Sequence, residues 1–94
     1  MVEVKLFAQF RDLAGEDTVS VEPEKAPLTI EDAISDLTSK CPQLREKLID
    51  SETEELQGGV IVMINGRNIS YLDGLETQLQ SSDRVAIFPP IAGG

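Results

Sequence analysis

Two segments near the start of the chain alternate apolar and polar residues, which is the pattern of a half-buried β-strand. They are residues 2–6 and 18–22, and we expect them to pair as a hairpin. The stretch between them, residues 7–15, is too long for a tight turn. Its Phe10 and Leu13 are expected either in the core, under the edge of the sheet, or on a surface that contacts a partner.

The next segment has the periodicity of an amphipathic helix. Its apolar residues recur at three- and four-residue spacing, which places them on one face: Ile30, Ala33, Ile34, Leu37 and Cys41. Thr29 is a typical N-cap residue, and Glu31 and Asp32 suit the positive end of the helix dipole. Pro42 is expected to end this helix, because it disfavours helical geometry in the residue before it. Residues 44–49 suggest a short second helical turn.

The second half of the chain is predicted to be mainly β. Residues 60–64 form a short apolar run rich in β-branched side chains, which predicts a central, buried strand. Asn65-Gly66 accepts positive φ at both positions and predicts a hairpin turn into a short strand at residues 67–69. Residues 84–88 are predicted to form the last strand, and Pro89 ends its pairing because it cannot donate to a ladder.

The order of these elements predicts an α+β domain with one main helix packed on a small mixed β-sheet. A sheet that holds a single helix and has the last strand running through its middle is a β-grasp. We therefore expect a β-grasp domain over residues 1–88 and a flexible C-terminal tail over residues 89–94. A chain of 94 residues has the length of one domain.

Composition excludes several classes of function. The net charge is 8 − 17 = −9, which argues against nucleic acids and anionic membranes and favours a basic partner surface or a simple role in solubility. The chain has no histidine, so the usual general base and metal ligand are missing. We find no catalytic set and no phosphate-binding loop, and we expect neither a bound metal nor a bound cofactor. A single cysteine and the lack of a long apolar run predict a cytoplasmic protein.

The most unusual chemical feature is the end of the sequence, Phe88-Pro89-Pro90-Ile91-Ala92-Gly93-Gly94. Glycine has no side chain, so a Gly-Gly end can pass through a narrow tunnel into the active site of another protein. The two prolines hold the base of the tail extended. A carboxylate is a poor acylating agent, so a partner enzyme would have to activate it, and adenylation by ATP is the general route. The alternative is a frayed terminus without a role.

Two segments carry a resemblance to a known family: Asp83-Arg84-Val85-Ala86-Ile87-Phe88-Pro89-Pro90-Ile91-Ala92-Gly93-Gly94 and Leu6-Phe7-Ala8-Gln9-Phe10-Arg11-Asp12-Leu13-Ala14-Gly15. They resemble the MoaD/ThiS group of ubiquitin-like sulfur carriers, which includes the small subunit of molybdopterin synthase and the small archaeal modifier proteins. Residues 28–33 and 64–66 are also similar, and the resemblance covers essentially the whole chain. Residues 50–57 look longer and more acidic than a compact bacterial carrier needs.

The resemblance implies that an E1-like enzyme, using ATP and magnesium, adenylates the carboxylate of Gly94, which is then converted to a thiocarboxylate. In the molybdopterin branch the tail enters the large synthase subunit and donates its sulfur. In the modifier branch Gly94 is joined to lysines of target proteins, and one protein can serve both branches. The implied tail and partner contacts are Phe88, Pro89, Pro90, Ile91, Ala92 and Phe10, beside the reacting Gly93-Gly94. A sole modifier role, a thiamine-pathway carrier and an inert β-grasp module are the alternatives, and the free chain is expected to be a monomer.

Overall fold

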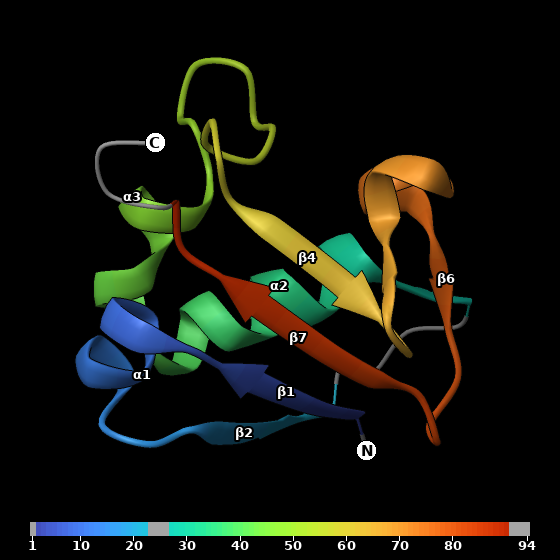
Figure 1. Ribbon diagram of the computed structural model, residues 1–94, viewed down its shortest axis with the longest axis horizontal. Helices are drawn as coiled ribbons and strands as arrows, with labels where there is room; N and C mark the ends of the chain where they lie inside the picture. The colour runs from blue at the N-terminus through green and yellow to red at the C-terminus, as the bar shows by residue number, and fades with distance from the viewer. Residues whose placement is uncertain (1, 23–26, 91–94) are drawn as a thin grey trace.

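In the computed structural model, which describes residues 2–22 and 27–90, five strands form one mixed sheet in the order β2-β1-β7-β4-β5. They are β1 (Val2–Leu6), β2 (Thr18–Val21), β4 (Ile61–Ile64), β5 (Arg67–Asn68) and β7 (Arg84–Phe88). The last strand, β7, lies in the middle of the sheet, parallel to β1 and antiparallel to β4 (Figure 1). The α+β class and the β-grasp arrangement are therefore confirmed.

The main helix, α2 (Ile30–Lys40), begins where the sequence predicts. The Thr29 hydroxyl accepts from the backbone N–H of Asp32 at 3.3 Å, and the Asp32 carboxylate accepts from the N–H of Thr29 at 3.0 Å. This capping box satisfies two backbone donors at the start of the helix. The helix ends before Pro42, and η1 (Pro42–Leu44) and α3 (Arg45–Leu48) form the expected short second helical segment.

The core lies between α2 and one face of the sheet. Alternate residues of each strand point inward, and in β1 the buried positions are Val2, Val4 and Leu6. In β7 the inward residues are Val85 and Ile87. In the part of the chain that the structure describes, no helix lies across the opposite face of the sheet (Figure 1). The domain thus has two layers and one open sheet face.

The segment after β1, which the sequence showed only to be too long for a tight turn, is a helix, α1 (Ala8–Ala14). Its start carries no recognisable signal, because Phe7 provides no side-chain cap and Ala8 has a φ of +51°. Phe10 is fully buried at 0% exposure, so the expectation that it contacts a partner is wrong and its alternative as a core residue is confirmed. Leu13, by contrast, is 37% exposed.

A second small sheet was also missed from the sequence. It pairs β3 (Leu28–Thr29) with β6 (Gln78–Leu79), and its strands are too short for an alternating pattern to be visible. The chain reaches it through two short 3₁₀ turns, η2 (Ile69–Tyr71) and η3 (Gly74–Glu76). Leu79 is buried there and closes one end of the core.

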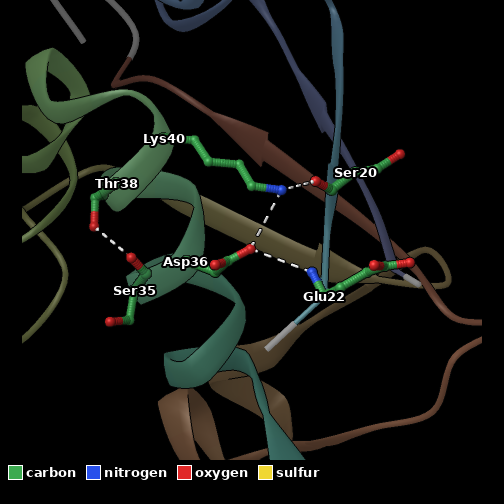
Figure 2. Close-up of polar contacts among 6 residues, drawn as sticks. All are labelled: Ser20, Glu22, Ser35, Asp36, Thr38 and Lys40. Carbon is green, nitrogen blue, oxygen red and sulfur yellow. Dashed lines mark hydrogen bonds and ion pairs between the residues drawn. The ribbon is translucent and has the colours of Figure 1, made fainter. Parts of the chain in front are cut away.

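The free edge of β2 is covered by polar side chains of α2, as Figure 2 shows. The Lys40 Nζ donates to the carbonyl oxygen of Ser20 at 2.6 Å, and the backbone N–H of Glu22 donates to the Asp36 carboxylate at 3.2 Å. Asp36 and Lys40 also form an ion pair at 3.5 Å. These contacts occupy backbone groups of an edge strand that could otherwise pair with another chain.

Candidate functional site

The base of the C-terminal tail lies on the open face of the sheet. Phe88 ends β7, and its ring stacks on that of Phe7 with centroids 4.3 Å apart and planes at 14°. The parallel register of β1 and β7 pairs Leu6 with Ile87, so the two stacked phenylalanines are the residues that directly follow this pair along the chain. The Nζ of Lys5 lies 5.5 Å from the centroid of the Phe7 ring, a cation–π geometry.

An apolar groove runs from this stack to the last described residues. Its volume is about 610 Å³. It is lined by Phe7, Ala8, Gln9, Ile61, Met63, Phe88, Pro89 and Pro90. The residues come from the ends of β1 and β7, from the start of α1 and from β4, so the fold brings together segments from both ends of the chain. Such a rimmed apolar surface typically marks a site of protein interaction.

Strand β4 supplies the groove with apolar side chains from the run that the sequence predicted to be a central, buried strand. Val62 and Ile64 are buried on the inner face, whereas Ile61 and Met63 remain only half-buried on the outer face. The predicted burial therefore holds for the inner face of the strand and not for its outer face, because a sheet with one helical layer has one open face. The apolar run does have a consequence, since it makes that open face apolar beside the tail.

Of the residues predicted for the tail and its contacts, Phe88, Pro89 and Pro90 meet in the groove. Phe88 and Pro89 are half-buried, and Pro90 is exposed. Ile91, Ala92, Gly93 and Gly94 lie outside the described residues. Phe10 follows Phe7 and lies in helix α1. It is buried in the core and does not line the groove.

Sequence reasoning missed Phe7, Ile61 and Met63 as groove residues. A signal was present: β1 and β2 alternate apolar and polar residues, whereas residues 60–64 are apolar throughout. With only one amphipathic helix predicted to cover the sheet, the apolar residues at every second position of that run have to lie on the uncovered face.

The acidic stretch after α3 is an ordered loop. Asp50 organises it, because its carboxylate accepts from the N–H groups of Glu52 and Thr53 at 2.8 and 3.3 Å. Ile49 and Leu56 form an isolated antiparallel bridge that closes the loop. Across residues 2–22 and 27–90, no three acidic or cysteine side chains converge in a way that could hold a metal ion. The helices of the same residues are all too short or too polar to span a membrane.

Comparison with known proteins identifies the family. Residues 4–94 match the model of the ThiS family. The chain belongs to the ThiS family. It is 34% identical over 93 residues to small archaeal modifier protein 3 of Haloferax volcanii, covering 99% of this chain and 98% of that protein.

Two further similarities cover nearly the whole chain. The molybdopterin synthase sulfur carrier subunit of Emericella nidulans is 28% identical over 92 residues, 98% of this chain and 96% of the relative. The crystal structure of SAMP1 from Haloferax volcanii superimposes with a TM-score of 0.86 at 31% identity, covering 99% of this chain and 98% of the other. The chain is thus a ubiquitin-like protein of the sulfur-carrier and modifier class, as its sequence predicted.

Proposed function

We propose that this ThiS-family chain presents its C-terminal Gly94 to an E1-like adenylating enzyme and uses the open sheet face as the docking surface. An apolar groove that runs directly into the base of the tail is the main support for this proposal. A partner that covers Phe7, Ile61 and Met63 gains hydrophobic area and at the same time holds the point from which the tail leaves the domain.

The chemistry is carried by the tail and the partner together. A carboxylate oxygen of Gly94 attacks the α-phosphorus of ATP, held with magnesium by the partner, and pyrophosphate leaves. A hydrosulfide ion then attacks the carbonyl carbon of the acyl adenylate, AMP leaves, and the resulting thioacid loses its proton to give a thiocarboxylate. Alternatively, the ε-amine of a target lysine attacks the carbonyl carbon of the acyl adenylate or of a thioester formed from it, AMP or the thiol leaves, and an isopeptide bond forms with loss of a proton.

Both fates require the same activated Gly94, and relatives of both kinds are similar to this chain over nearly its full length. One relative is named as a modifier and another as a carrier subunit of molybdopterin synthase. For this chain, the partner is therefore proposed to be the activating enzyme first, and then either the large synthase subunit or lysines of target proteins.

The experiment compares two N-terminally tagged forms in the native host, the full-length chain and a chain that lacks Gly93 and Gly94. Heavier bands on denaturing, reducing gels that require the intact tail would demonstrate conjugation. A single band whose intact mass shows one oxygen replaced by sulfur would demonstrate the carrier role. Equal behaviour of both forms, with neither conjugate nor thiocarboxylate, would overturn the proposal. Cooperative unfolding of the truncated chain at an unchanged temperature is the control for folding.

A further inference from the structure

Gly59 lies directly opposite Pro90, at the point where the tail leaves the sheet. The antiparallel register of β4 and β7 pairs Ile61 with Phe88. If the same register is continued two residues before Ile61 and two residues after Phe88, Gly59 lies beside Pro90. Pro90 has no N–H to donate, so the ladder of hydrogen bonds stops there, although the segments that carry Gly59 and Pro90 still lie side by side.

The two residues are in close contact. A Cβ built on Gly59 would lie 2.9 Å from the Cβ of Pro90 and 3.3 Å from its Cγ. Cβ atoms essentially never approach this closely, so any side chain at residue 59 would force a displacement. The proline ring is closed onto its own backbone nitrogen and cannot rotate away. The displacement would therefore move the backbone at the base of the tail.

The turn that carries Gly59 is anchored on its other side. The N–H of Val60 donates to the carbonyl of Gln57 at 3.1 Å, and Gly59 has a φ of +86°, as the third residue of a type II turn requires. The N–H of Gln57 donates to the carbonyl of Leu48 at 2.8 Å, and its side-chain amide donates to the carbonyl of Glu46 at 2.9 Å. The turn is thus tied to α3, so the tail and not the turn would give way.

We infer that Gly59 is a positioning residue: its missing side chain lets Pro90 sit against the anchored turn and thereby fixes the base of the tail for activation of Gly94. This inference rests on the proposed function. Only four residues separate Pro90 from the end of Gly94, and four residues span at most roughly 14 Å, so a displacement at Pro90 acts close to the reacting carboxylate. Displacement of about 1 Å from a productive geometry can cost a factor of about 100 in rate.

The test compares Gly59 with Gly66, which share a positive φ and differ in whether an added Cβ would meet a neighbouring atom. Gly66 also has a strongly positive φ, +85°, but a Cβ there would meet nothing within 4 Å. Gly59→Ala and Gly66→Ala therefore carry the same backbone strain, and only the first pushes on Pro90. Gly58→Ala is a second control, because Gly58 lies in the same turn and a Cβ on it would also meet nothing within 4 Å.

The readout is the fraction of each chain that carries a thiocarboxylate or a conjugate at Gly94 in the native host, together with the melting temperature of the purified protein. We expect Gly59→Ala to lower that fraction at least about tenfold, in line with the sensitivity of positioned reactants to small shifts. Gly66→Ala should lose a similar amount of thermal stability and keep its product. Equal product from the two variants would overturn the inference.

Pro90→Gly provides an independent test that does not depend on how well Gly59→Ala folds. It removes the Cβ and Cγ that the new methyl group would meet, and we expect it to lower the product without lowering the melting temperature. In the Pro90→Gly background, adding Gly59→Ala should have no further effect on the product. A further loss comparable to that in the natural background would contradict a mechanism that acts through Pro90.

The outcomes separate this inference from the function on which it rests. If the chain lacking Gly93 and Gly94 forms as much product as the full-length chain, the proposed function fails and the inference falls with it. If product depends on Gly93-Gly94 but Gly59→Ala matches Gly66→Ala, the function stands and only the positioning role fails. A nuclear Overhauser effect between Gly59 and Pro90 protons in the free protein is expected, and its absence would also overturn the contact.

Discussion

The rings of Phe7 and Phe88 stack at a centroid distance of 4.3 Å, joining the residue after the first strand to the last residue of the final strand. The pair is half-buried and forms one wall of the apolar groove. It therefore contributes both to the stability of the sheet and to the surface offered to a partner. Replacing either ring should affect these two properties together.

Phe7→Ala is expected to lower the free energy of unfolding by about 2 kcal/mol, the sum of half a buried aromatic side chain and one aromatic pair. It should also weaken activation of the tail, because the groove loses a wall. Urea denaturation followed by circular dichroism measures the first effect, and product yield at Gly94 measures the second. Phe7→Leu is the matched control for lost apolar area. A Phe7→Ala protein with unchanged stability would show that the stack contributes nothing.

Ala8→Gly is expected to stabilise the protein. Ala8 opens α1 with a φ of +51°, a left-handed conformation that costs an L-residue roughly 1–2 kcal/mol and costs glycine almost nothing. After the higher backbone entropy of glycine in the unfolded chain is subtracted, the gain should be about 0.5–1 kcal/mol. The midpoint of urea denaturation measures it.

The control for this substitution is the next residue. Gln9→Gly lies in the same helix, is also exposed, and has no positive φ to relieve. It should therefore destabilise by up to about 1 kcal/mol. Effects of the same sign at residues 8 and 9 would contradict the assignment of strain to Ala8.

Thr29→Ala should cost about 1 kcal/mol of unfolding free energy, because it removes the hydroxyl that accepts from the backbone of Asp32 at the start of α2. Thr29→Ser keeps the hydroxyl and should recover most of the loss. Thermal melts of the two variants measured side by side test this. If serine and alanine were equally destabilising, the methyl group of Thr29 would be responsible and not its cap.

Asp36→Ala is expected to expose the edge of β2. The backbone N–H of Glu22 loses its acceptor, so its hydrogen exchange should become faster, while the unfolding free energy changes by less than about 1 kcal/mol. Exchange measured residue by residue by NMR tests this. Ser39→Ala on the same helix is the matched control and should leave the rate at Glu22 unchanged. An unchanged rate in Asp36→Ala would mean that solvent or another group already satisfies this N–H.

The sequence by itself determined the elements whose signals are local. Alternation places β1 and β2, three- and four-residue spacing with Thr29 in front places α2, and Asn65-Gly66 places the hairpin between β4 and β5. The residues of the tail alone also pointed to it as a candidate reactive group, and that role stays a prediction. Each of these features depends on neighbours in the chain, so periodicity and side-chain chemistry are sufficient to find it.

Only the tertiary structure decided what the open face of the sheet carries. Helix α1 has no side-chain N-cap and begins with a left-handed alanine, so its start is specified by packing and not by local sequence, and the burial of Phe10 is likewise a result of packing. The stack of Phe7 on Phe88 and the room that Gly59 leaves for Pro90 both depend on strand register. Register is set by which faces are buried across the whole sheet, and no local pattern contains that information.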